Sequence, residues 1–87
     1  MKAIITTVGK DKVGILSEVS TVCKLENANI IEVTQSVLED MFCMIMLVDI
    51  SSAEFDKLSA RLAEVETKLN LKIHIMHEDI FNSMHRI

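Results

Sequence analysis

The chain turns from a predicted strand into a predicted helix at Val8-Gly9-Lys10-Asp11-Lys12-Val13-Gly14, a stretch that holds both of its glycines. Lys2 to Val8 is rich in β-branched residues, as strands are, and from Gly14 to Asn27 apolar residues recur at helical spacing. Such a turn leaves backbone N–H groups free at the helix start, where they suit a carboxylate. Gly14 would let a ligand approach, and Asp11 would cap the helix or reach a ligand amine. The stretch is compatible with a site for a small anionic or zwitterionic molecule, and taken alone it fits an ordinary turn at least as well.

The composition indicates a single domain with an apolar core. Of 87 residues, 49% are hydrophobic and the formal net charge is −4, which argues against nucleic acid as a partner. The start carries no signal-peptide pattern, and the longest apolar run, Met41 to Val48, is too short to span a membrane. Cys23 and Cys43 are too few for a disulfide framework. These features predict a cytoplasmic protein, and a domain this small gains stability by self-association.

A predicted hairpin follows the first helix. Asn27-Ala28-Asn29 is a turn signal, Ile30 to Leu38 reads as the second strand, and Glu39-Asp40 joins it to a third, Met41 to Val48. In the second strand, alternate positions share a face; these are Ile31, Val33 and Val37, with Gln35 between them.

The third strand is apolar on both faces. One face can pack on helices, and the other needs a cover, for which a partner subunit is the simplest choice. The pattern leaves open which face points outward; Met44 and Met46 are one candidate pair. A homodimer is therefore predicted.

The second half of the chain repeats the helix and strand. Ser51 and Glu54 match a capping box, and Asn70 is a predicted C-terminal cap. Between them an apolar stripe recurs at helical spacing: Phe55, Leu58, Leu62, Val65 and Leu69. Leu71 to His77 then alternates as the fourth strand, with Leu71, Ile73 and Ile75 on one face and Lys72, His74 and Met76 on the other.

The element order βαββαβ predicts an α+β fold of the ferredoxin-like type, a four-stranded antiparallel sheet with two helices on one face. We expect residues 1–78 to form this domain and residues 79–87 to form a tail. The tail carries Ile80, Phe81 and Met84 in a short helical stripe, which is expected to dock on a neighbouring subunit.

Catalytic, metal and RNA chemistry find little support. No nucleophile–base set or phosphate loop is present, and no cofactor is indicated. His74 and His77 would point to opposite faces of a strand, and His85 lies in the tail, so a zinc site would need a bulge or a partner chain. The chain has no Trp or Tyr to stack on RNA bases.

The loop and the start of the second strand resemble the ACT domain family. The likeness lies in Asp11-Lys12-Val13-Gly14-Ile15-Leu16 after Val8-Gly9, together with Asn29-Ile30. It covers Met1 to about His77 and is similar to small stand-alone ACT proteins and to the ACT modules of a glycine-cleavage regulator.

The resemblance implies a non-enzymatic regulatory module that forms a homodimer and binds a small effector, often an amino acid, near the first strand-to-helix loop at a subunit boundary. The residues implied to bind are Asp11, Val13, Gly14, Ile15, Asn29 and Ile30. The alternative is a dimeric protein-interaction module that takes no ligand and acts on a separate partner. A second protein as partner is open on both interpretations, whereas nucleic acid and membrane are not expected.

Overall fold

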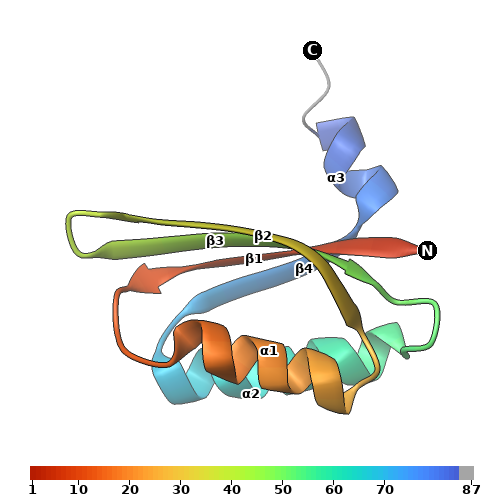
Figure 1. Ribbon diagram of the computed structural model, residues 1–87, viewed down its shortest axis with the longest axis horizontal. Coiled ribbons are helices and arrows are strands. Elements are labelled where there is room, and N and C mark those ends of the chain that lie inside the picture. Colours follow the sequence, from red (N-terminus) through yellow and green to blue (C-terminus); the bar gives the residue numbers. More distant parts are fainter. Residues whose placement is uncertain (85–87) are drawn as a thin grey trace.

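The computed structural model describes residues 1–84. Its elements are β1 (Lys2–Lys10), α1 (Ile15–Leu25), β2 (Asn29–Leu38), β3 (Met41–Asp49), α2 (Phe55–Leu69), β4 (Lys72–His77) and α3 (Glu78–Met84). The strands form one antiparallel sheet in the order β2-β3-β1-β4. Helices α1 and α2 cover one face, and α3 rises on the opposite side (Figure 1). The predicted βαββαβ fold is confirmed. The predicted tail is α3 as far as Met84, and its last part, residues 85–87, lies outside the described residues.

The core lies between the sheet and the two long helices. Alternate residues of β1 and β3 face the helices, which is why Ala3 and Ile5 are fully buried and Met44 and Met46 are 1% and 0% exposed. The helices contribute a matching set, namely Ile15, Val19, Val22, Cys23, Leu58, Leu62 and Val65. Met44 and Met46 therefore belong to the core, and placing them on the outward face is wrong. The outward face of β3 carries Met41, Cys43, Ile45 and Leu47, as its register with β1 requires.

The first helix begins later than predicted. Gly14 precedes it as a left-handed N-cap with φ 93°, and α1 ends at Leu25, ahead of Asn27 at φ 63°. Val13 lies before the helix and is fully exposed. The buried face of α1 is formed by Ile15, Val19, Val22 and Cys23, which recur at helical spacing.

The predicted capping box at the second helix is wrong. Glu54 is the N-cap of α2, and no side chain caps this helix in the described residues. Ser51 turns back to Asp49 instead: its N–H and hydroxyl both donate to Asp49 Oδ1, at 2.9 and 2.7 Å. The predicted C-terminal cap of α2 is confirmed, since Asn70 adopts the left-handed conformation there.

Strand β2 forms one edge of the sheet. Its register shifts between Ile30 and Glu32, so that Ile31 is the extra residue of a β-bulge. Beyond the bulge, Val33 and Val37 pair with Met46 and Phe42, as the predicted alternation requires. From residue 31 to residue 38 every side chain is exposed. The outer edge of β2 thus presents backbone groups that the sheet does not pair.

Candidate functional site

The β1–α1 loop leaves the start of α1 open. No side chain caps α1, and the first helical bond runs from the Glu18 N–H to the Gly14 carbonyl oxygen at 2.9 Å. The N–H groups of the first turn, those of Ile15, Leu16 and Ser17, therefore have no partner within the helix. A Cβ atom built on Gly14 would meet nothing within 4 Å. Helix N–H groups with open space beside them can hold an anionic group.

Asp11 fixes the loop through its backbone and leaves its carboxylate exposed. Its N–H donates to the carbonyl oxygen of Asp40 at 2.7 Å, which ties the loop to the β2–β3 turn. Of the two roles predicted for the Asp11 side chain, capping of α1 does not occur. The carboxylate remains on the surface beside the helix start, where a ligand amine could reach it.

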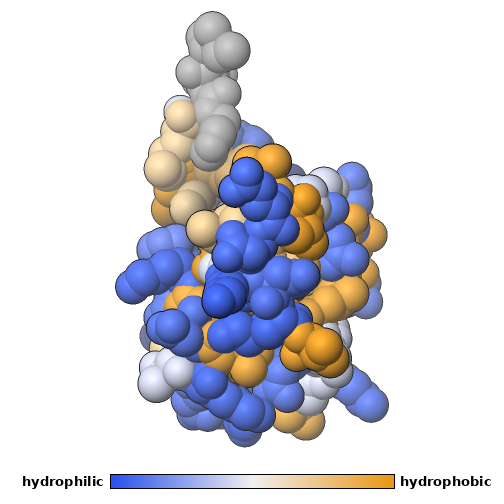
Figure 2. Space-filling view, turned by 90° about the vertical axis from the view of Figure 1, so that its left-hand side faces the viewer, coloured by the Kyte–Doolittle hydropathy of each residue, from blue (hydrophilic) through white to orange (hydrophobic). Residues whose placement is uncertain are grey.

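Lys12 points to the other helix. Its Nζ atom donates a hydrogen bond to the carbonyl oxygen of Leu69 in the last turn of α2. The loop therefore spans from the hairpin turn, through Asp11, to the end of α2. Figure 2, which views the molecule from this end, shows apolar atoms exposed among hydrophilic ones. Val13, the fully exposed valine, belongs to this surface.

Asn29 and Ile30 do not reach the loop within one chain. Asn29 pairs with Asp49, which in turn pairs with Lys2, whereas the loop follows Lys10 at the other end of β1. The eleven residues of α1 lie between them, a length of about 16 Å. The structure thus brings Asp11, Val13, Gly14 and Ile15 together, and the expectation that Asn29 arrives beside them is not met in a single subunit.

The roles of Asp40 and Lys12 were missed from the sequence. Both depend on contacts between segments far apart in the chain, and neither residue belongs to a local motif that would reveal them. Thr7 carries a further unpredicted feature: its hydroxyl is fully buried and has no hydrogen-bond partner in the described structure.

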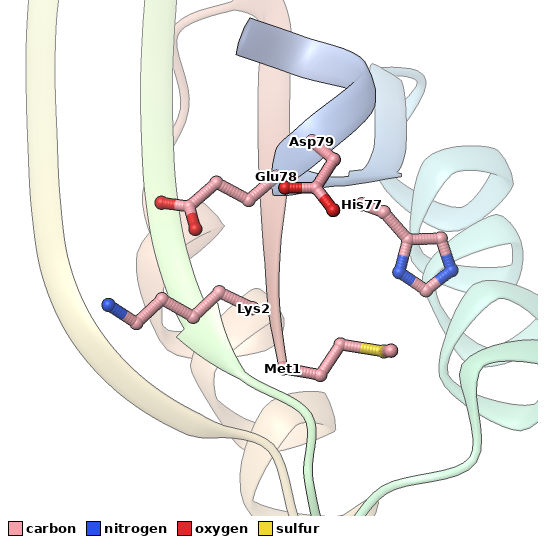
Figure 3. Close-up of a pocket in the computed structure, with 5 residues that line it drawn as sticks. All are labelled: Met1, Lys2, His77, Glu78 and Asp79. Atoms are coloured by element: carbon pink, nitrogen blue, oxygen red, sulfur yellow. The ribbon is translucent and has the colours of Figure 1, made fainter.

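An open cavity of about 460 Å³ lies at the other end of the sheet, lined by Met1, Lys2, His77, Glu78 and Asp79. Figure 3 shows the two carboxylates at the start of α3, with Lys2 on the adjoining strand.

The described residues contain no group of three or more side chains suited to a metal ion. His74 and His77 lie on opposite faces of the sheet, as predicted. The His77 ring stacks on that of Phe55 on the helix side, with 4.6 Å between the ring centroids. His85 lies outside the described residues. In residues 1–84, no helix has the length and apolar character that crossing a bilayer requires.

Comparison with known proteins agrees with this fold. A family model described as ACT domain matches residues 2–76. A UPF0237 protein from Clostridium perfringens is 48% identical over an alignment of 89 positions, which spans the whole of both chains. An ACT domain protein from Streptococcus pneumoniae superimposes with a TM-score of 0.80 at 39% identity, over 93% of each chain. A putative glycine cleavage system transcriptional repressor shares the fold, with a TM-score of 0.77 at 24% identity over 86% of this chain and 44% of its own.

The fold is that of a class of regulatory, ligand-binding modules, and the chain belongs to that class, the ACT domain family. Within that family it groups with the UPF0237 proteins. ACT domains are regulatory rather than catalytic; they generally bind small-molecule effectors and often dimerise.

Proposed function

We propose that this protein is a non-enzymatic regulatory module of the cytoplasm that binds an amino acid at the β1–α1 loop, next to a homodimer interface. The observation that carries the proposal is the uncapped start of α1 beside a left-handed Gly14 with open space around it. Two free thiols, Cys23 and Cys43, fit a reducing compartment.

An amino acid offers one carboxylate and one ammonium group. The carboxylate would accept hydrogen bonds from N–H groups at Val13 to Ile15 and from the unpaired N–H groups of Leu16 and Ser17 that follow, where the positive end of the helix dipole adds to the attraction. The ammonium would lie near Asp11, whose carboxylate is exposed and does not cap the helix. Each charged hydrogen bond contributes about 1.5–3 kcal/mol, so removing one should weaken binding by roughly ten- to a hundredfold.

A dimer through β2 would complete the site. When two copies pair their β2 strands antiparallel about a two-fold axis, the Asn29 end of one strand lies beside the Leu38 end of the other. Leu38 pairs with Met41, and Met41 with Lys10, so this is the end at which the loop lies. Asn29 and Ile30 of the partner subunit would then approach the loop that their own subunit keeps distant. The exposed edge of β2, with its unpaired backbone groups, supports this arrangement.

The test separates steric block from backbone strain at Gly14. Because Gly14 has φ 93°, both Gly14→Ala and Gly14→Val carry the strain of a left-handed residue, but only valine fills the space beside the helix start. A thermal-shift screen with the common amino acids identifies the ligand, and calorimetric titration then compares the two variants with the wild type. We expect Gly14→Ala to bind within a fewfold of wild type and Gly14→Val to lose at least tenfold.

Asn29→Ala tests the contribution of the partner subunit. It should weaken binding roughly tenfold while leaving the melting temperature of the free protein unchanged, because Asn29 is exposed. If all three variants bind like the wild type, the ligand occupies another site. If no amino acid binds the wild type at millimolar concentration, the proposal fails.

A second candidate function is a ligand-free dimeric module that acts on a separate protein. The fully exposed Val13, with Leu16 at 38% exposure in the next turn, favours this alternative, because paired apolar side chains at a loop suit a protein contact. Val13→Lys would then abolish partner capture by the immobilised protein, whereas the amino acid screen would give no shift.

A further inference from the structure

The face of the sheet that α1 and α2 leave uncovered is apolar along its centre and polar at its sides. Strand β3 presents Met41, Cys43, Ile45 and Leu47 on this outer face. The two edge strands of the sheet present mainly polar or charged side chains on this face: Glu32, Thr34 and Ser36 beside Leu38 from β2, and Lys72 and His74 beside Met76 from β4. An apolar centre within a polar rim is the usual anatomy of a protein interface.

Helix α3 covers only half of this outer face. It contacts β1 and β4 and has no contact of note with β2 or β3. Two isoleucines on the outer face show the difference in coverage: Ile4 on β1 is 7% exposed, whereas Ile45 on β3 is 46% exposed. On the uncovered half the surface is hollowed, in a cavity of about 140 Å³ lined by Glu32, Thr34, Ile45 and Leu47.

The helix itself carries unused apolar surface. Ile80 and Met84, one helical turn apart, are 52% and 65% exposed, and no residue of α3 is buried. Because α3 begins directly after His77 ends β4, no linker allows it to move across to the hollow of its own subunit.

We propose that the outer face and α3 together form a self-association interface, in which Ile80 and Met84 of each subunit enter the hollow over β2 and β3 of a second copy. A two-fold axis parallel to the strands places β2 opposite β4, and β3 opposite β1, of the partner. It therefore carries the partner's α3 from its own β1–β4 half onto the uncovered β2–β3 half. The exchange is reciprocal, as a two-fold interface requires.

The dimensions fit a second copy of the chain. Seven residues of α3 rise about 10 Å, which is close to the ~10 Å spacing of sheets packed face to face. Five exposed apolar side chains of the outer face and α3 (Val8, Met41, Ile45, Ile80 and Met84) are each 40% to 65% exposed. Together they offer on the order of 400 Å² of apolar surface, about what a standard interface of ~800 Å² per partner contains.

This interface is distinct from the β2 edge and does not depend on ligand binding. The two surfaces use different residues, so Val33→Lys on the helix side of β2 should impair edge pairing and leave the outer face intact. The two-fold axis of the outer-face dimer runs along the middle of the sheet, whereas that of edge pairing passes through β2, so the axes do not meet and both interfaces together would build an open array. The Val33→Lys variant therefore isolates the outer-face dimer.

Sedimentation equilibrium of the full chain tests the proposal. In the Val33→Lys variant we expect a dimer at about 100 μM, and a monomer when either Ile45→Lys or Ile80→Lys is added, with association weakened at least tenfold. Ala60→Lys, at an exposed position on α2, is the matched control and should leave the dimer intact. Pairing Ile45→Asp with Ile80→Lys should restore the dimer, because opposite charges would meet across the interface. The proposal is overturned if adding Ile45→Lys and Ile80→Lys leaves the mass unchanged or if Val33→Lys is already a monomer at this concentration.

Cys43 supplies a measurement that needs no substitution. It lies on the outer face beside Ile45, while Cys23 is fully buried and should remain silent. Alkylation of Cys43 should slow at least tenfold between 1 μM and 100 μM protein. A rate that does not change with concentration would contradict the proposal even if the lysine variants fail to fold, and it would say nothing against amino acid binding at the loop.

Discussion

The Lys12 side chain joins the β1–α1 loop to the second helix by donating a hydrogen bond to the carbonyl oxygen of Leu69. The carbonyls of a last helical turn have no partner within the helix, and a cation there also interacts favourably with the helix dipole. A single surface lysine thus both caps α2 and holds the loop that carries Gly14.

Replacing Lys12 by methionine keeps the aliphatic chain but removes the ammonium group. We expect Lys12→Met to lower the free energy of unfolding by about 1 kcal/mol, because the Leu69 carbonyl loses a charged donor. Urea denaturation measures the change. Lys10→Met, two residues earlier and also exposed, is the control and should shift stability by less than half as much. Equal effects would show that Lys12 does not act as a cap.

Substitution of Gly9 should destabilise the fold through a steric clash, unlike substitution of Gly14, which faces open space. A Cβ atom on Gly9 would lie 2.5 Å from Leu71 Cδ2, and Leu71 is buried, so Gly9→Ala should cost about 1–3 kcal/mol through overpacking. Shortening Leu71 removes the clash. The double variant Gly9→Ala/Leu71→Ala should therefore lose less than the sum of the single losses, as thermal or urea unfolding would reveal. Additive losses would mean that the two residues do not press on each other.

Burial raises the pKa of the Cys23 thiol to about 11, from an ordinary value of 9.0. The folded state therefore favours the protonated thiol, and the stability this contributes is complete below pH 9 and declines as the pH rises from about 9 to about 11. Melting temperatures measured from pH 8 to 11 should fall more steeply for the wild type than for Cys23→Ala. Parallel curves for the two proteins would remove Cys23 as the cause.

The hydrogen bonds from Ser51, first from its hydroxyl and then from its backbone N–H, hold the pKa of Asp49 below its ordinary value of 3.8. A depressed pKa in the folded state stabilises the protein above pH 3.8, and this contribution is lost as the pH falls through the folded-state pKa. Ser51→Ala should raise the pKa of Asp49, as an NMR titration of the carboxyl carbon would detect. Ser52→Ala, beside it and exposed, should leave that titration unchanged.

Most of the architecture could be predicted because it depends on local patterns. The alternation of β4 correctly placed Ile73 and Ile75 on one shared face, which the structure turns toward the helices. Asn70 ends α2, as its tolerance of the left-handed conformation predicts. The prediction for the start of α2 was wrong, because two local hydrogen-bonding patterns compete for Ser51. Ser51 matched a capping box, but the nearer Asp49 carboxylate accepts both of its donors, and α2 begins without a cap.

By itself, then, the sequence determined the order of the strands and helices, the chain turn at Gly14 and the likeness to the ACT family, since hydrophobic period, turn residues and a local motif are properties of neighbouring residues. Only the tertiary structure decided which face of β3 is buried, because that depends on the side from which both helices approach. It also decided that Asn29 lies at the far end of the sheet from Gly14. Strand register across β1, β3 and β2 sets that separation, and register is fixed by contacts between segments that the sequence pattern cannot place in space.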